Sequence, residues 1–554
     1  MKLSIVPSAH PRSVPSTAAA LVLLLLTAAC GGPARQQAAP EPAPEAVTAP
    51  ADDGIPWFEG SVEAAFELAK RERRPVFLYW GAVWCPPCHA LRARIFPRPE
   101  IRARLAAAVP VYLDGDTERA QIWGEKLGTQ GYPTVIVFDA DGREITRLPS
   151  LLPVGEYADL LASALDAARP ISDVLAAAEA EGVATLPDAE VQLLAFYSWD
   201  QDSALGLDAA RRRELFARFR SELGPDRKLE RARFLALELA ALAELEPAPA
   251  LSSAERTGLA SSLTALLSDP ATRSTNLDLL VYRAGAVVTR LAPEPGPERD
   301  ALVAAWSAAA REVEADEALS VDDRLSALAP QLELATLPPA AGPTPAVPEA
   351  LRERVRERVR WADAAIADED ELQAVMDTMA GLLEEAGLLD EAKSLLSERL
   401  AETAAPYYYV GYLASLEAKS GRAPEAVALY RDAWQRARGA TSGAGMTPFR
   451  WGSGYLRQAM KLTPDAEAAI AADSRAVLAE LLGSPDAFAG GNWGRLTGLA
   501  TAFEQWRAGD ESERGAIVDA ARAQVAAACA GLADAGPDSP GGRCRGFLAP
   551  RRAG

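Results

Sequence analysis

The sequence predicts an α/β domain, with a central mixed sheet flanked by helices, followed by a large all-α region. Between residues 56 and 170, short apolar runs alternate with amphipathic stretches, which is the pattern of strands and helices in one domain. From residue 171 onward alanine, leucine, glutamate and arginine dominate, and apolar residues recur at intervals of three and four, as in helices. Because 554 residues exceed the usual size of one domain, we expect several.

The first 30 residues have the features of an export signal. A weakly basic start precedes a short apolar run over residues 18–29, and small residues stand directly before Cys30. This segment resembles a bacterial lipoprotein signal peptide, which implies an acylated Cys30, a membrane anchor and a protein that faces the periplasm. The same resemblance implies the outer membrane rather than the inner one, because Gly31 and not aspartate follows the cysteine. The alternative is ordinary secretory cleavage, which leaves Cys30 free or removes it.

Residues 31–55 are rich in proline and alanine. They contain too few large apolar side chains to bury a core, so we expect a semi-extended linker. No later run of the sequence is long and apolar enough to predict a membrane span.

The predicted α/β domain covers residues 56–170. Apolar periodicity and turn residues predict its elements in chain order. They are a helix over 61–73, a strand over 75–80, a helix from 89 to 94, a strand over 109–114, a helix over 118–127, a strand over 135–138, a turn at 139–142, a strand over 144–148 and a closing helix over 154–168.

Trp84-Cys85-Pro86-Pro87-Cys88 follows the first predicted strand and opens a helix. At a helix N-terminus, unpaired N–H groups and the helix dipole favour a thiolate, which is the nucleophile in disulfide exchange. We therefore assign Cys85 as the attacking thiol and Cys88, one turn on, as the resolving thiol. The two prolines are tolerated in a first helical turn and stiffen the loop.

These residues and this element order, over about 57–168, resemble the thioredoxin superfamily, and more closely its periplasmic thiol-disulfide interchange members than cytosolic thioredoxin. The resemblance implies that Pro133, in Gly131-Tyr132-Pro133-Thr134, is cis and faces the cysteine pair. It also implies that the segment before it binds substrate as an added strand. The residues it suggests for substrate binding are Trp84, Pro86, Pro87, Tyr132 and Pro133.

The sequence departs from thioredoxin behind the cysteines. Tyr79 stands where thioredoxin has a buried aspartate, and Pro110 stands where the partnering lysine would be. The proton of Cys88 then needs another route, through water or Asp114.

Two other interpretations of the motif remain open at this stage. Cys85-Pro86-Pro87-Cys88-His89 matches the signature for covalent c-type haem, although such motifs sit among short helices. A structural disulfide or half of a zinc site is the second, but His89 is the sole histidine after the leader, so zinc lacks ligands. We expect no cofactor and no metal.

The all-α region divides into helical domains at 171–335 and 349–554, joined by a Pro-rich linker at 336–348. A 34-residue repeat lies at about 373–440: small or bulky residues recur at Ala380/Ala414, Gly387/Gly421, Ala392/Ala426 and Leu396/Tyr430. This period resembles the tetratricopeptide repeat. The alternative is a generic helical bundle with a chance coincidence of small residues.

Cys529 and Cys544 flank a loop rich in glycine and proline near the C-terminus. In an exported protein we expect them to form a structural disulfide that holds the tail. A second redox relay served by Cys85 is the alternative, but nothing local in the sequence would depress their acidity.

Acidic residues outnumber basic ones by 20, which disfavours a nucleic-acid partner. The sequence therefore predicts a membrane-anchored extracytoplasmic thiol-disulfide oxidoreductase, more a reductase than an oxidase. Its expected partners are exported proteins with disulfides and an unidentified redox protein. The alternative is a lipid-anchored repeat scaffold whose first domain binds extended peptide without catalysis.

Overall fold

A computed structural model describes residues 54–149, 152–167, 169–339, 343–440, 446–484, 486–530, 532 and 536–548. The predicted signal peptide with Cys30, and the predicted linker up to residue 53, lie outside the described residues. Among the helices that are described, none combines the length and the apolar character needed to cross a membrane.

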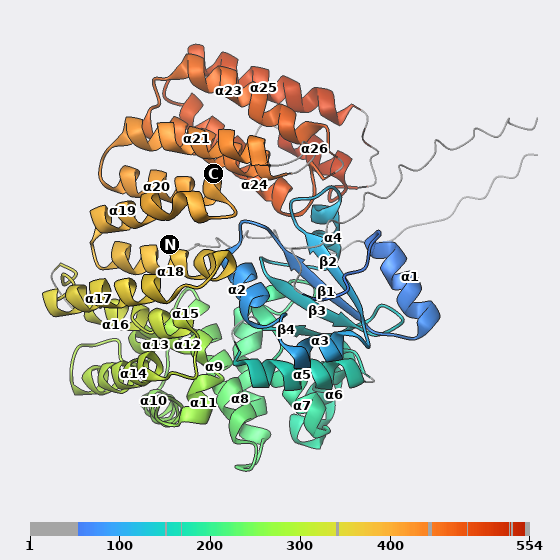
Figure 1. Ribbon diagram of the computed structural model, residues 1–554, viewed down its shortest axis with the longest axis vertical. Helices are drawn as coiled ribbons and strands as arrows, with labels where there is room; N and C mark the ends of the chain where they lie inside the picture. Colours follow the sequence, from blue (N-terminus) through green and yellow to red (C-terminus); the bar gives the residue numbers. More distant parts are fainter. Residues whose placement is uncertain are drawn as a thin grey trace, which may run out of the picture. The chain divides into compact units, whose positions relative to one another are not determined.

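The N-terminal domain is built on a four-stranded mixed sheet of order β2-β1-β3-β4 (Figure 1). Strand β1 runs parallel to β2 and antiparallel to β3, and β3 runs antiparallel to β4. Its elements are α1 (Val62–Glu72), β1 (Val76–Gly81), α2 (Pro86–Arg94), α3 (Pro99–Leu105), β2 (Val109–Asp114), α4 (Ala120–Lys126), β3 (Thr134–Phe138), β4 (Glu144–Leu148) and α5 (Val154–Asp166).

The predicted α/β class and mixed sheet are confirmed. Short helix α3 was not among the predicted elements, because it is rich in arginine and lacks a long apolar stripe; Pro99 at its first turn fixes its start. Helix α4 begins at Ala120 rather than at residue 118.

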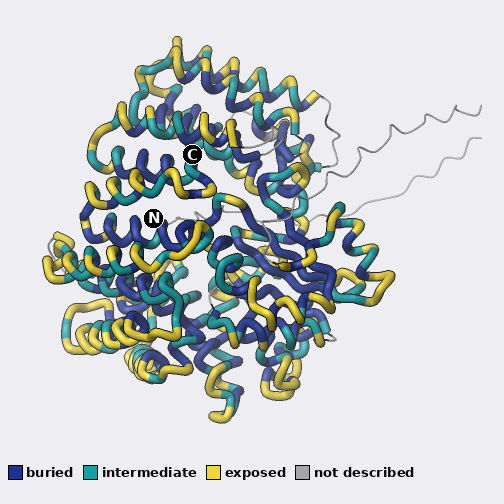
Figure 2. Tube along the Cα trace, in the orientation of Figure 1, coloured by how far each residue is buried: buried dark blue, intermediate teal, exposed yellow. Residues whose placement is uncertain are grey.

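Helices cover both faces of the sheet. Successive side chains of a strand point to opposite faces, so neighbouring residues of β1 contribute to two different apolar clusters. Phe77 and Tyr79 of β1 join a cluster with α2, α3 and α5, whereas Leu78 and Trp80 join a second cluster with α1 and α4. Figure 2 shows the strands mostly buried, and all six residues of β1 are buried.

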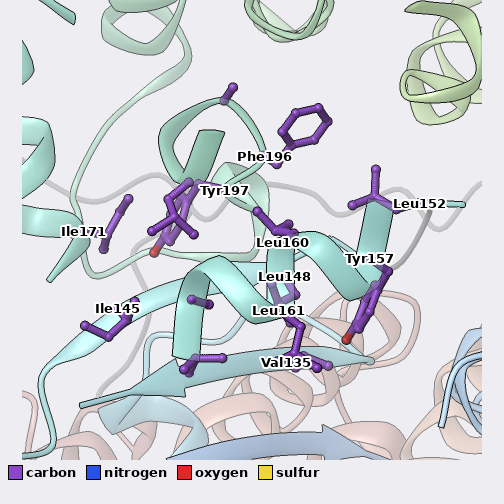
Figure 3. Packing of buried hydrophobic residues seen from close by; sticks show 14 of the residues in the cluster. Val135, Ile145, Leu148, Leu152, Tyr157, Leu160, Leu161, Ile171, Phe196 and Tyr197 are labelled. Carbon is purple, nitrogen blue, oxygen red and sulfur yellow. The ribbon is translucent and has the colours of Figure 1, made fainter. Parts of the chain in front are cut away.

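The apolar cluster on the first face continues past residue 170. Leu148 and Leu161 belong to the same cluster as Ile171, Phe196 and Tyr197, which come from the segment that follows α5 (Figure 3). The helices after residue 170 therefore complete the core of the sheet. The domain boundaries inferred from composition stay predictions.

The remainder of the described chain is helical, which confirms the predicted all-α region. Its helices are α6 (Ile171–Glu181), α7 (Asp188–Ala195), α8 (Ala209–Glu222), α9 (Lys228–Glu244), α10 (Ser253–Ser268), α11 (Pro270–Ser274), α12 (Leu277–Tyr282), α13 (Ala284–Leu291), α14 (Pro297–Ala315), α15 (Val321–Ser326), α16 (Ala329–Ala335), α17 (Glu349–Ala365), α18 (Glu369–Glu385), α19 (Leu389–Arg399), α20 (Pro406–Lys419), α21 (Ala423–Ala440), α22 (Thr447–Leu462), α23 (Glu467–Leu482), α24 (Gly490–Arg507), α25 (Glu513–Cys529) and α26 (Pro540–Leu548). Short 3-10 turns lie at Val183–Thr185, Trp199–Gln201 and Leu400–Glu402.

The 34-residue repeat corresponds to two helical pairs, α18/α19 and α20/α21. Ala380 and Ala414 are fully buried in the first helix of each pair. Gly387 and Gly421 form the turns with φ of 75° and 77°, a left-handed conformation that favours glycine. The two pairs thus place the same residue types at matching positions, and their assignment to the tetratricopeptide family stays a prediction.

Candidate redox site

Cys85 lies between β1 and α2, where it caps the N-terminus of the helix. Its Sγ accepts a hydrogen bond from the backbone N–H of Cys88 at 3.2 Å, and Pro86 occupies the first helical position. Helix N-termini favour negative charge on a sulfur. When the pair is reduced, this geometry stabilises a thiolate on Cys85.

Cys88 lies one turn further along α2, with its Cα atom 5.2 Å from that of Cys85, and the two sulfurs form a disulfide. Both residues are covered: Cys85 is 2% exposed and Cys88 is 1% exposed. A partner sulfur therefore reaches Cys85 only after neighbouring groups move.

The Tyr132–Pro133 peptide bond is cis and immediately precedes β3. Pro133 lines the same cavity as Pro86 and Pro87. The cis bond agrees with the sequence resemblance, and the expectation that Pro133 faces the cysteine pair stays a prediction. Thr134, which pairs with Trp80 of β1, donates its hydroxyl hydrogen to the carbonyl oxygen of Gly131 at 2.8 Å and closes this turn.

Tyr79 lies behind Cys88 and donates its hydroxyl hydrogen to the carbonyl oxygen of Cys88 at 3.5 Å. Its ring centroid lies 5.0 Å from that of Phe96 and 5.3 Å from that of Tyr112. An aromatic cluster thus fills the space that a buried carboxylate occupies in thioredoxin. The pKa of Asp114, at the end of β2, is raised to about 7 by burial and by the charge of Asp116.

Trp84, directly before the pair, is tied to the helical region through Asp116. The indole N–H of Trp84 donates to one carboxylate oxygen of Asp116 at 2.7 Å, and the hydroxyl of Thr447 donates to the same oxygen at 2.7 Å. Arg450 of α22 donates to the other oxygen at 3.0 Å. Burial opposes ionisation of Asp116, but the charge of Arg450 and these hydrogen bonds outweigh it and lower its pKa.

The ring of Trp84 is enclosed by side chains of α20 and α22. It stacks on Tyr408 at 6.1 Å between centroids and meets Trp451 edge to face at 6.2 Å. The guanidinium of Arg450 lies 4.4 Å from the Trp84 ring centroid, a cation–π contact. Tyr132 meets Trp84 edge to face at 5.5 Å.

Helix α2 also packs on α18. His89 Nδ1 lies 2.5 Å from Asp370 Oδ1, and its Nε2 lies 2.7 Å from the carbonyl oxygen of Val83. Both ring nitrogens therefore have partners within the protein, which argues against His89 as an axial haem ligand. Arg94 forms a bidentate pair with Glu371, with its shorter contact at 2.8 Å.

A cavity of about 980 Å³ lies beside the pair. Pro86, Pro87, Tyr132 and Pro133 line it on one side, and residues of α8, α9, α12, α15 and α18 line the other. Trp84 does not line it, because its ring faces α20 and α22. Of the five residues suggested for substrate binding, four therefore border open space.

Cys529 at the end of α25 and Cys544 on α26 form a second disulfide, with Cα atoms 5.7 Å apart. Arg543, next to Cys544, donates two hydrogen bonds of 2.6 Å to the carboxylate of Glu125 on α4. The tail helix is thus held to α25 covalently and to the N-terminal domain by charge.

Asp116, Tyr408, Arg450 and Trp451 were not found by sequence reasoning. Asp116 and Arg450 are 334 residues apart, so no local spacing connects them. The described residues contain no group of three or more His, Cys, Asp or Glu side chains that could hold a metal ion.

The mixed sheet and the Cys85–Cys88 pair at the start of α2 are the features of one class of domain. Residues 62–165 match the family model of a thioredoxin-like domain, so the chain consists of such a domain followed by a large helical region. A segment of 80 residues is 35% identical to the thiol:disulfide interchange protein DsbD of Cronobacter sakazakii, and it covers 14% of this chain and 14% of that protein. The similarity is thus confined to a small part of each chain.

Proposed function

We propose that this protein is a membrane-anchored, extracytoplasmic thiol-disulfide oxidoreductase that acts on protein disulfides through Cys85 and Cys88. The observation that carries the proposal is the cysteine pair at the N-terminus of α2 beside the cis Tyr132–Pro133 bond. The match to a thioredoxin-like domain and the similarity to a thiol:disulfide interchange protein support it.

In this proposal the Cys85 thiolate attacks a client disulfide, forms a mixed disulfide and releases one client thiolate. The thiolate of Cys88 then attacks the Cys85 sulfur, releases the second client thiolate and leaves the Cys85–Cys88 disulfide. Two electrons pass from the protein to the client. A dithiol protein on the same side of the membrane must then reduce the pair again, which makes the protein a reductase.

Pro86, Pro87 and Pro133 are proposed to contact the client, because they border the cavity. Tyr132 also borders it, while its hydroxyl accepts hydrogen bonds from Gln121 at 3.0 Å and Arg450 at 3.3 Å. Trp84 is proposed to hold the redox loop against the helical region rather than to touch the client.

The proposed anchor is an acylated Cys30 on the periplasmic side of the outer membrane. Cells fed labelled palmitate should incorporate label into the parent and not into Cys30→Ser. Label in both proteins, or in neither, would contradict the proposed acylation of Cys30 and would leave the redox proposal unaffected.

The central experiment is a trap. Cys88→Ala should accumulate mixed disulfides between Cys85 and exported proteins, which run as high-mass bands that a reductant collapses. Cys85→Ala/Cys88→Ala should show none, and Cys529→Ser serves as a control for an unrelated cysteine. The parent should also reduce insulin. If the variant forms no such bands and the parent does not reduce insulin, the proposal is contradicted.

A scaffold without redox activity is the second candidate. Its supporting observations are the coverage of Cys85 and the paired helices α18 to α21. A scaffold predicts that Cys88→Ala behaves as the parent in every binding and phenotype assay.

A further inference from the structure

The redox loop is closed on one side and open on the other. Side chains of α20 and α22 cover Trp84, through Tyr408, Trp451 and Arg450. Pro86 and Pro87, on the other side, border the cavity of about 980 Å³. Cys85 itself is 2% exposed and does not line the cavity, so a client that enters the cavity meets the helical wall first and reaches the sulfur only after groups next to Pro86 and Pro87 move.

Five arginines line the cavity, and four of them are paired with carboxylates. Arg212 lies 2.6 Å from Glu244, and Arg233 lies 2.8 Å from Asp278. Arg94 is held by Glu371 at 2.8 Å. Arg283 lies 3.0 Å from Glu244. These four paired arginines offer little net positive charge to a ligand, whereas Arg98, the fifth, forms no ion pair within the described residues and donates to the carbonyl oxygen of Arg94.

Carboxylates outnumber cations in the cavity lining, with seven acidic residues against five arginines. Asp322 lies 3.8 Å from Arg94, which Glu371 already engages, and accepts a hydrogen bond from Thr378 at 2.7 Å. Asp377 accepts a hydrogen bond from the hydroxyl of Tyr408 at 3.0 Å and forms no ion pair within the described part of the chain. Burial raises the pKa of Asp322 to about 6 and also raises that of Asp377, as expected for carboxylates short of positive charge.

An aromatic ring stands beside these carboxylates. Tyr282, at the end of α12, lines the same cavity and is 61% exposed, which is rare for a large ring in this structure. A solvent-open aromatic face next to carboxylates is the arrangement that binds the ammonium or guanidinium group of a side chain.

We infer that the cavity selects clients with a lysine or arginine near the disulfide, and that Asp322, Asp377 and Tyr282 receive that cation. The inference rests on the proposed oxidoreductase function and adds its substrate class. Arg94, beside Asp322, ends the nine-residue helix α2 that Cys85 caps. Such a helix rises about 13 Å, which an extended client spans in about four residues. The cation is therefore expected about four residues from the client cysteine.

The test uses the full chain with its cysteine pair reduced, and disulfide-linked dimers of a short Ser/Gly peptide with one cysteine. Three dimers are compared, in which lysine, glutamine or glutamate stands four residues from the cysteine, both before and after it. The rate of peptide-thiol release is divided by the rate of each dimer with dithiothreitol. The lysine dimer should react about threefold to tenfold faster than the glutamine dimer, and the glutamate dimer slowest.

Asp322→Asn/Asp377→Asn should bring the lysine-to-glutamine ratio close to one. Tyr282→Leu should lower the ratio partially. Asp432→Asn, an exposed carboxylate on α21, controls for the loss of a negative charge from an acidic protein and should keep the ratio.

A ratio of one in the parent, a ratio unchanged by the double substitution, or an equal fall in Asp432→Asn would each overturn the inference. In all three cases the glutamine dimer still reacts, so the proposed function stands. If no dimer reacts with the reduced parent, the proposed function itself fails.

Discussion

The indole N–H of Trp84 donates a 2.7 Å hydrogen bond to the buried carboxylate of Asp116, so the residue directly before Cys85 is fixed to the end of β2. The same carboxylate pairs with Arg450 of α22 at 3.0 Å. One buried charge thus connects the redox loop, the sheet and the helical region. The helical region is therefore part of the structure around the cysteine pair rather than a separate attachment.

Arg450→Ala is expected to destabilise the protein and to uncover Cys85. It leaves the Asp116 carboxylate buried without its cation, which costs about 3–5 kcal/mol in comparable buried pairs. It also removes the cation that covers the Trp84 ring. The melting temperature should fall, and iodoacetamide should alkylate Cys85 of the reduced variant faster than that of the parent.

Asp116→Asn should partly rescue the stability of Arg450→Ala, because no unpaired charge then remains. Arg436→Ala, which breaks an exposed pair with Asp432 on α21, is the matched control and should change neither property. Equal alkylation rates in Arg450→Ala and Arg436→Ala would contradict the proposed role of the contact.

Asp114→Asn should stabilise the protein in a pH-dependent manner. The folded-state pKa of Asp114 is about 7, above its ordinary value of 3.8, so the folded protein binds the proton more tightly than the unfolded chain. Stability from this group is fully present below about pH 4 and is lost as pH rises to about 7. Asparagine imitates the protonated form and avoids that loss.

The measurement is the difference in melting temperature between Asp114→Asn and the parent, at intervals from pH 5 to pH 8. The difference should increase with pH and level off above about pH 7. A difference that stays constant would show that Asp114 ionises normally. Asp432→Asn provides the control for loss of one exposed charge.

The disulfide between Cys529 and Cys544 should hold α26 in place. The bond closes a loop with a sequence separation of 15, and loops of this size are stabilised by about 3 kcal/mol in the chain-entropy model. In a Cys85→Ala/Cys88→Ala background, Cys529→Ser/Cys544→Ser should speed amide hydrogen exchange over residues 536–548. Reductant should do the same to the background protein and add nothing to the variant.

The local parts of this structure could be predicted from sequence. Phe77, Leu78 and Tyr79 form a continuous apolar run that fixes a buried strand, and the Cys-Pro-Pro-Cys motif marks the start of α2. Gly387 and Gly421 recur 34 residues apart because each helical pair needs a left-handed turn at the same place.

The contacts around the redox loop could not be predicted in that way. Asp116 and Arg450 are ordinary charged residues in their local sequence. Whether they form an ion pair depends on how α22 packs against the end of β2. The contact between His89 and Asp370 has the same character, since the two residues are 281 positions apart. Charge pairs over such separations leave no periodic signal in a single sequence.

Gly387→Ala and Gly421→Ala should destabilise the protein by the same amount, about 1–2 kcal/mol each, because alanine is strained in the left-handed region. Apart from the glycine and its two chain neighbours, no atom lies within 4 Å of the position of a Cβ at either glycine, so the effect comes from the backbone alone. Gly258→Ala is the matched control: Gly258 lies inside α10 with equally open space, and alanine there should stabilise the helix by about 1 kcal/mol. Chemical denaturation followed by circular dichroism measures all three, and the double variant Gly387→Ala/Gly421→Ala should show the sum of the two losses. Clearly unequal losses at the two turns would mean that the helical pairs are not equivalent units, and the interpretation of residues 373–440 as a repeat would then be abandoned.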